Sequence, residues 1–266
     1  MTRIHRFTGS ADTVPVNAYV IEGDDGVVVV DGTLTVSGGR GLRARVEATG
    51  KPLAGVLVTH AHPDHYGGLV ELPEAPIYAL AGVAEAIRRD DDAKEQILRP
   101  MFGDEWPARR VFPDRAVAGG DEVTLAGLTF TALDLGPGES PHDGVWLLGD
   151  SAFSGDQFYG RMHAYLADGF HEQWLANLAR LRRELPPAAR LHPGHGEPAG
   201  LEMLDWQETY IHTFLDAVRA ADWSDPERAG ASVVAAVTAF LPADDLRFLM
   251  ELSIEPVAAQ GGLIAR

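Results

Sequence analysis

The chain has 266 residues, of which 45% are hydrophobic and 23% charged, a composition typical of a globular protein with one large domain or two small ones. Its net charge of −17 disfavours binding to nucleic acid or to an anionic membrane surface, and no apolar run is long enough to span a bilayer. The polar segment 1–12 does not resemble a signal peptide, so we expect a cytoplasmic protein.

Strand and helix signals alternate in the first half of the chain. Two apolar runs at 18–21 and 27–30, separated by turn-forming residues, predict a hairpin. Further along, the sequence predicts a helix at 40–49, strands at 54–59 and 76–80, a helix at 81–98, and strands at 123–135 and 145–148. The proline-rich and aromatic segment 99–115 is either a lid over a pocket or a packed surface connection.

Helical patterns dominate the remainder, at 171–185, 201–221, 226–240 and 244–260. Alternating elements followed by helices favour one layered α/β domain over two independent ones. We therefore predict a single domain over residues 1–266, with 201–266 as helices packed on it.

The segment that carries the chemistry is His60-Ala61-His62-Pro63-Asp64-His65, which directly follows a buried strand. In an extended segment His60 and His62 project to the same side, so both can bind one metal ion. Asp64 and His65 then face the same space from the turn after Pro63. Because the sequence contains no cysteine, a metal site here must use His, Asp and Glu.

Two later segments also place a metal-binding side chain among small residues just after an apolar strand. They are Ser154-Gly155-Asp156 and His192-Pro193-Gly194-His195-Gly196. A catalytic metal ion needs at least three protein ligands, so Asp156 and His195 are candidates for the remaining positions.

The order HxHxDH, then Gly-Asp after a strand, then PGHG resembles the signature of the metallo-β-lactamase-fold hydrolases. The resemblance implies a four-layer αββα sandwich, here with additional C-terminal helices, and two divalent metal ions at one edge of the sheets. Carried over by position, His60 and His62 hold the first ion, Asp64, His65 and His195 hold the second, and Asp156 bridges them.

One position departs from that pattern. The third ligand of the first ion is usually a His, but this chain has Glu139 there, within Gly138-Glu139-Ser140-Pro141. The alkylsulfatase branch of the superfamily also has a Glu in a similar context. We predict Glu139 as the ligand and keep His142, three residues on, as the alternative.

Three carboxylates facing two divalent ions leave a charge of +1, whereas a His in place of Glu139 would leave +2. The metal pair is then expected to be a weaker Lewis acid. Zinc remains the default, and the oxygen ligands make manganese or iron the alternatives.

Four further residues are weaker candidates. Asp31, after the strand at 27–30, resembles the buried Asp that supports the metal-binding loops in this superfamily. Tyr66 follows the metal-binding segment and is a candidate hydrogen-bond donor to substrate. His163 follows Asp156 closely and is a candidate pocket residue, as is His142 if it is not a ligand.

The predicted function is hydrolysis of a small-molecule ester, lactone, thioester or amide by two metal ions, with Asp64 as the catalytic carboxylate. Because Glu139 stands where the superfamily usually has a His, sulfate-ester hydrolysis is an alternative function. An iron-dependent oxidoreductase of the same fold is a further alternative. A binding protein without catalysis is disfavoured by seven intact ligand positions. The substrate and the oligomeric state are not determined by the sequence.

Overall fold

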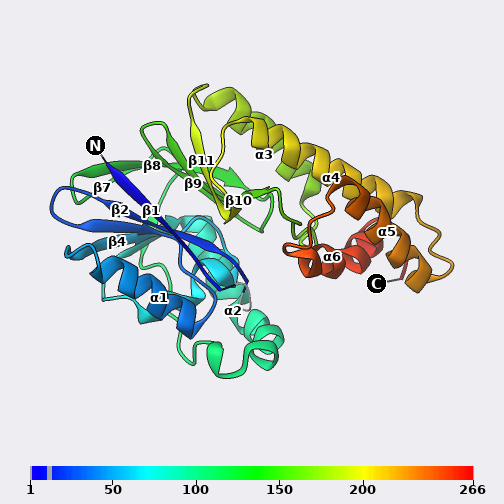
Figure 1. Ribbon diagram of the computed structural model, residues 1–266, viewed down its shortest axis with the longest axis horizontal. Coiled ribbons are helices and arrows are strands. Elements are labelled where there is room, and N and C mark those ends of the chain that lie inside the picture. The colour runs from blue at the N-terminus through cyan, green and yellow to red at the C-terminus, as the bar shows by residue number, and fades with distance from the viewer. Residues whose placement is uncertain (1, 11–13, 266) are drawn as a thin grey trace.

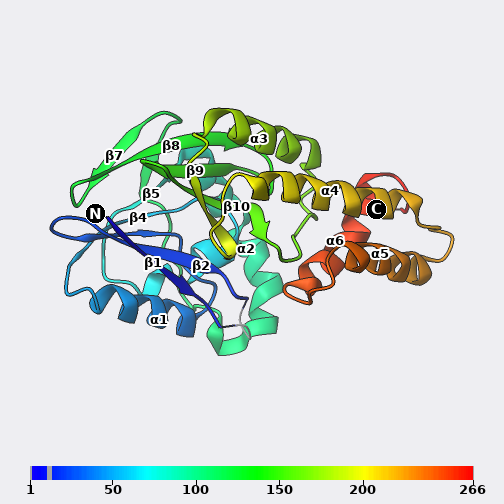
Figure 2. The same ribbon diagram turned by 45° about the horizontal axis from the view of Figure 1, so that its top comes forward.

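The computed structural model describes residues 2–10 and 14–265 (Figure 1). Part of segment 1–12, on which the expected cytoplasmic location depends, lies outside these residues. Two mixed β-sheets pack face to face and helices lie on the outer side of each, as Figures 1 and 2 show. This architecture confirms the predicted αββα sandwich.

The first sheet has six strands in the spatial order β1 to β6. The strands are β1 (Arg3–Thr8), β2 (Asn17–Glu22), β3 (Val27–Val30), β4 (Leu53–Leu57), β5 (Ile77–Leu80) and β6 (Arg115–Val117). The predicted hairpin is confirmed, since Val20 in β2 lies opposite Val29 in antiparallel β3. The strands β3 to β6 run parallel. The four valines of β3 are fully buried, as expected for a central strand covered on both faces.

The second sheet has the order β11-β10-β9-β8-β7, with only β10 and β11 parallel among these described strands. The strands are β7 (Glu122–Leu125), β8 (Leu128–Gly136), β9 (Asp143–Leu148), β10 (Ser151–Gly160) and β11 (Arg190–Gly196). The prediction of one strand over 123–135 is therefore wrong. Ala126 and Gly127 both have positive φ, +50° and +77°, which makes the tight turn of a hairpin between β7 and β8.

The helices divide between the two sheets. On the first sheet lie α1 (Val36–Glu47) and α2 (Ala81–Phe102), and on the second lie α3 (His171–Glu184) and α4 (Glu202–Ala220). The last helices, α5 (Pro226–Phe240) and α6 (Arg247–Gln260), pack on α4. Short 3₁₀ helices occupy Pro63–His65, Gly67–Glu71 and Gly103–Glu105. None of the described helices is long and apolar enough to cross a lipid bilayer.

Two hydrophobic cores hold these layers together. One lies between the sheets, where the Trp146 indole of β9 donates a hydrogen bond to the carbonyl of Val58 across the interface, at 3.0 Å. The other joins the second sheet to α3, α4, α5 and α6. The C-terminal helices thus share a core with the sandwich, while the single-domain assignment over 1–266 stays a prediction.

Segment 99–115 is mostly anchored. Helix α2 continues to Phe102, four residues beyond the predicted end, so Met101 and Phe102 are helical. Past the helix, Trp106 is buried and the Arg110 guanidinium lies 5.1 Å from the centre of its ring. The part after the helix therefore packs as a surface connection.

The two sheets meet at the edge where β3 and β4 end. Asp31 follows β3 directly, and His60 follows β4 closely. A backbone bridge joins His60 to Asp143 at the start of β9, and another joins Val16 to His195 in β11. These contacts bring the polar segments of both sheets to one place.

Candidate metal centre

Two groups of buried side chains at this edge have the composition of metal sites. His60, His62, Glu139 and Asp156 form the first cluster, and Asp64, His65, Asp156 and His195 form the second. In each cluster one potential ligand atom per residue lies within 4.8 Å of all the others. Asp156 belongs to both clusters. The structure therefore brings together the seven residues that the sequence singled out as ligands.

Each histidine has one ring nitrogen held by a partner outside the clusters. His60 Nδ1 lies 3.0 Å from Thr59 Oγ1, and His195 Nδ1 lies 3.1 Å from the carbonyl oxygen of Pro15. The other nitrogen of each ring then points into a cluster. Partners of this kind fix the tautomer and orientation of a metal-binding imidazole.

The other two histidines are held by carboxylates. His65 Nδ1 lies 3.0 Å from Asp31 Oδ2, and His62 Nε2 lies 3.0 Å from Asp168 Oδ2. Asp31 also accepts hydrogen bonds from the backbone N–H and the hydroxyl of Thr59, each at 2.8 Å. Asp31 therefore links the segment after β4 to His65, while its supporting role for a metal ion stays a prediction.

The free nitrogens face carboxylates across short distances. His195 Nε2 lies 3.2 Å from both Asp64 Oδ2 and Asp156 Oδ2, and His65 Nε2 lies 3.4 Å from Asp156 Oδ1. In the first cluster Glu139 Oε2 lies 3.0 Å from His62 Nδ1 and 3.6 Å from His60 Nε2. These are the atoms that would converge on an ion.

The pKa values show that this region favours positive charge. Burial opposes the protonation of His195, but the carboxylates of Asp156 and Asp64 outweigh it and raise its pKa to about 10. In the same way, burial lowers the pKa of His62 and His65 less than their neighbouring carboxylates raise it. For His60 burial dominates and its pKa falls well below the usual value. A divalent cation would supply the charge that the carboxylates attract.

Several polar atoms turned into the clusters have no hydrogen-bond partner among the described residues. They include His60 Nε2, His65 Nε2, Glu139 Oε2 and Asp156 Oδ1. A buried polar atom without a hydrogen bond costs about 1–3 kcal/mol, and these four have only the His–carboxylate pairs of 3.0–3.6 Å described above, so a further partner is expected. Metal ions provide one, because the orphaned atoms are good ligands and lie in the two clusters.

Two glycines keep the clusters compact. Gly155 has φ +51° at an irregularity in β10, and a Cβ there would lie 2.9 Å from His60 Nδ1. A Cβ on Gly194 would overlap Asp156 Oδ1 and crowd the His65 ring. The sequence interpretation placed Asp156 and His195 in loops after strands. Both instead belong to β10 and β11, and their glycines allow the close approach that we expected.

Glu139 takes the position that the sequence analysis gave it. The residue is 1% exposed and lies in the turn between β8 and β9, with Oε2 toward the first cluster. Its Oε1 accepts a hydrogen bond of 2.8 Å from the Tyr159 hydroxyl. Burial and nearby carboxylates raise the pKa of Tyr159 well above its usual value, so the hydroxyl stays protonated and is the donor of this hydrogen bond. Tyr159 thereby fixes which oxygen of Glu139 faces the cluster.

Three of the weaker candidates lie outside the clusters. His142 Nε2 pairs with Asp134 Oδ1 at 2.9 Å. The Tyr66 hydroxyl donates to Asp91 Oδ1 at 3.0 Å, and its ring is fully buried. His163 bonds to the Tyr210 hydroxyl at 3.0 Å and to the Ala243 carbonyl at 2.9 Å. Their side chains are engaged in packing, and none of the three lines the cavity described next.

The clusters form the floor of an open cavity of about 220 Å³. Tyr159 and Tyr165 line it beside the metal-site residues, and its walls are mostly apolar side chains of α2 and α6. The Tyr159 ring stacks on His195 at 5.1 Å between ring centres, and Tyr165 meets His62 edge-on at 5.6 Å. The candidate metal centre is thus accessible to a small molecule from one side.

Sequence reasoning missed Tyr159, Tyr165 and Asp168. Tyr159 is three residues beyond Asp156 in β10, but the pairing with β11 is irregular between Gly155 and Tyr159, so strand alternation does not predict its direction. Tyr165 and Asp168 lie in the segment between β10 and α3, which carries no motif.

Comparisons with known proteins agree with this geometry. The model of the metallo-beta-lactamase superfamily matches residues 11–195. A hydroxyacylglutathione hydrolase from Methylobacillus flagellatus is 30% identical over 152 residues, which cover 56% of this chain and 51% of the relative. This chain therefore spans about half the length of that curated relative.

Solved structures resemble the whole chain more closely in fold than in sequence. A metallo-beta-lactamase family protein from Thermus thermophilus has a TM-score of 0.68 and 18% identity, covering 100% of this chain and 95% of its own. A sec-alkyl sulfatase, PisA1, has a TM-score of 0.68 and 16% identity, covering 98% of this chain and 49% of its own. The similarity to these two structures concerns the fold alone.

Proposed function

This chain belongs to the metallo-β-lactamase superfamily, and on that premise we propose that it is a dinuclear metal-dependent hydrolase of a small-molecule ester, lactone, thioester or amide. The observation that carries the proposal is the pair of buried clusters that share Asp156, with every histidine oriented by an outer partner. A thioester is the first choice, because the relative from Methylobacillus flagellatus is named for a hydroxyacylglutathione thioester.

The chain's own residues have distinct tasks in this proposal. The first ion is held by His60, His62, Glu139 and Asp156, and the second by Asp64, His65, Asp156 and His195. When bound, two divalent ions supply Lewis acidity and a water molecule of lowered pKa. We expect zinc first. Manganese and iron are the alternatives, because the three carboxylates supply oxygen ligands that these ions also accept.

Asp64 is the proposed catalytic carboxylate. Its side chain is 16% exposed, more than the other side chains of the second cluster, and it lines the cavity. Burial opposes its charge, but His65 and His195 lower its pKa below the usual value, so it is ionised at neutral pH. An ionised carboxylate facing the cavity can orient water and accept a proton.

A sulfate ester is the second candidate substrate. One observation favours it: the first cluster contains the carboxylate of Glu139, at the position where the alkylsulfatase branch of the superfamily also has a Glu. No specific observation favours the iron-dependent oxidoreductase. A cytoplasmic location, a small-molecule partner and the absence of nucleic-acid and membrane partners stay predictions.

The test combines metal analysis with a substrate panel. The purified protein is analysed for bound metals and assayed on a hydroxyacyl thioester, a lactone, a chromogenic β-lactam, an aryl ester and an alkyl sulfate. We expect two ions per chain and turnover of a thioester or carboxylic ester that is lost with a chelator and restored by zinc or manganese. Turnover of the sulfate alone would favour the second candidate. Two bound ions without turnover of any of these compounds would contradict both.

Removal of the metal ions is expected to lower the melting temperature by about 10 °C. The ions bind the folded state, because the clusters draw residues from both sheets, and tight binding adds about 4 kcal/mol at a thousandfold excess over Kd. Calorimetry with and without chelator measures the shift, and chelator presaturated with metal is the control. An unchanged melting temperature would contradict the prediction.

A further inference from the structure

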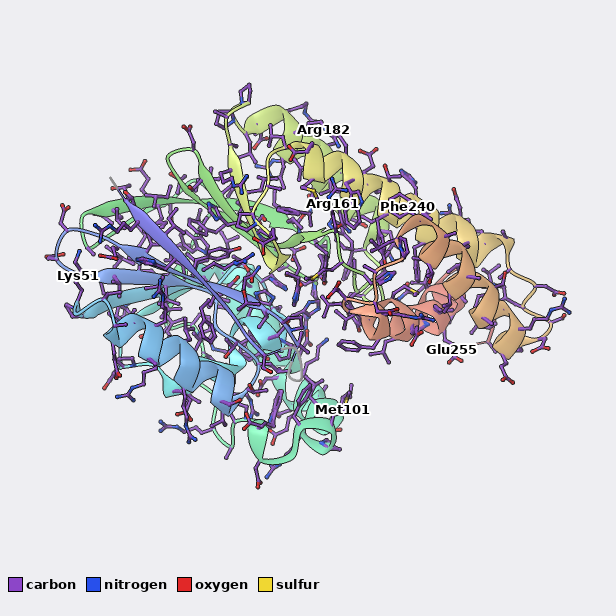
Figure 3. The ribbon with its side chains drawn as sticks, in the orientation of Figure 1. Lys51, Met101, Arg161, Arg182, Phe240 and Glu255 are labelled. Atoms are coloured by element: carbon purple, nitrogen blue, oxygen red, sulfur yellow. The ribbon has the colours of Figure 1, made fainter. Side chains whose placement is uncertain are left out.

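The walls of the cavity expose large apolar side chains to solvent. Ile97 and Met101 of α2 are 62% and 60% exposed, and Phe248 and Leu252 of α6 are 41% and 55% exposed. Contiguous exposure of this kind in a soluble protein marks a binding site more often than a scattered apolar residue does. In Figure 3 Met101 lies at the end of α2 that approaches α6.

These side chains belong to two facing helix surfaces that continue the metal centre outward. Ile97 and Met101 are four residues apart and lie on one face of α2, and Phe248 and Leu252 repeat this spacing on α6. All four line the same cavity as His62 and Asp156. We call these four residues and the space between them the apolar cleft.

Polar groups in the cavity are concentrated on its floor. Along the walls, Lys94 is the only charged lining residue that α2 or α6 contributes within the described chain. A polar substrate would therefore lose water along the walls without gaining hydrogen bonds. An apolar chain would instead remove both its own surface and the exposed side chains from water.

From this geometry we infer that the apolar cleft binds the hydrocarbon chain of a medium-chain acyl ester or acyl thioester, with the acyl carbonyl at the metal centre. The inference rests on the proposed hydrolase function for the carbonyl and on the cleft for the chain. One wall comes from α2, which covers the first sheet, and the other from α6, which packs on α4, so the hydrocarbon chain would extend outward between these helices.

The first measurement is chain-length dependence. The kcat/KM of the metal-loaded protein is determined for acetyl, butanoyl, octanoyl and dodecanoyl esters and thioesters. We expect an increase of at least about tenfold from acetyl to octanoyl, since each buried methylene contributes to binding. In the double variant Met101→Gln/Leu252→Gln the ratio of the octanoyl to the acetyl kcat/KM should fall toward one. Both positions are exposed, so the fold is expected to tolerate the changes.

The matched control is Leu263→Gln, which removes an apolar side chain that is 37% exposed and lies outside the cleft. It should retain the wild-type chain-length dependence. Loss of the dependence in this variant as well would overturn the inference.

A second measurement separates the cleft from the chemistry. Binding of 2-decanone and of acetone, which are not hydrolysed, is followed by calorimetry. Wild-type protein should bind 2-decanone at least about tenfold more tightly than acetone, and the double variant should lose this preference. If 2-decanone binds in this way but no ester or thioester is cleaved, the binding of hydrocarbon chains in the cleft is supported and the proposed hydrolase function is wrong.

If esters are cleaved with no dependence on chain length and 2-decanone does not bind, the hydrolase stands and the cleft inference is wrong. The cleft inference is also wrong if the wild-type protein is a dimer in solution and the double variant is a monomer. The exposed side chains would then form the interface between two copies of the chain.

Discussion

Asp156→Asn is expected to remove both metal ions and to lower kcat/KM by at least about a thousandfold. Asp156 belongs to both clusters and is 3% exposed, and its two oxygens face His65 and His195 separately. Burial opposes its charge, but those histidines hold its pKa well below the usual value, so the native side chain is an anion. The amide of Asn removes that negative charge from both clusters at once. Metal binding is then weakened in both, and the proposed catalysis depends on the bound ions.

Metal content measured by mass spectrometry of the purified protein, together with kcat/KM, tests this prediction. The comparison variant His195→Ala removes a ligand from the second cluster alone and should leave one ion per chain. Asp143→Asn changes a buried carboxyl that belongs to neither cluster and accepts hydrogen bonds from Ser140, so two ions should remain. One ion retained in Asp156→Asn would show that Asp156 does not bridge.

The grouping of the candidate ligand residues could be predicted from the sequence because most of them are close together in the chain. His60, His62, Asp64 and His65 lie in one short segment, where strand geometry and a proline turn already place them together. The fold class followed from the same motif through the resemblance. For Asp156 and His195 the residue type and the flanking glycines were sufficient, although the strand boundaries were not.

The supporting residues could not be predicted, because their partners are distant in the chain. Asp168 reaches His62 across 106 positions, and the Pro15 carbonyl reaches His195 across 180. No short spacing encodes such contacts, and a single sequence carries no other signal for them. The apolar cleft was missed for the same reason, since α2 lies on the first sheet and α6 packs on α4, far along the chain.

Segment 99–115, which the sequence left as either a lid or a surface connection, contributes the end of α2 to a fixed wall of the cavity. Met101 lines the cavity as part of a continuous helix, while Trp106 is buried. Pro100 has no N–H to donate within α2, and the helix ends two residues later at Phe102. A fixed wall built by α2 is consistent with the cleft, which needs no closing segment.

Glu139→Gln is expected to remove one metal ion per chain and to lower kcat/KM by at least about a hundredfold, whereas His142→Ala should leave both unchanged. Glu139 is buried with Oε2 beside His60 and His62, and its other oxygen is held by Tyr159. Glutamine retains the shape but loses the anion that complements a cation. Even the hydrogen-bond partners of metal ligands cost about 10–100-fold when changed, so loss of a ligand should cost more.

His142 is the matched comparison because the sequence left it open as the alternative ligand. Its ring pairs with Asp134 at 2.9 Å and packs so closely on Gly82 that a Cβ there would overlap Nδ1. It belongs to neither cluster, so turning inward would require breaking that pair and rearranging the turn between β8 and β9. Metal content and kcat/KM of the two variants decide between the residues. Loss of an ion in His142→Ala together with two ions in Glu139→Gln would reverse the assignment and leave Tyr159 holding a carboxylate with no part in metal binding.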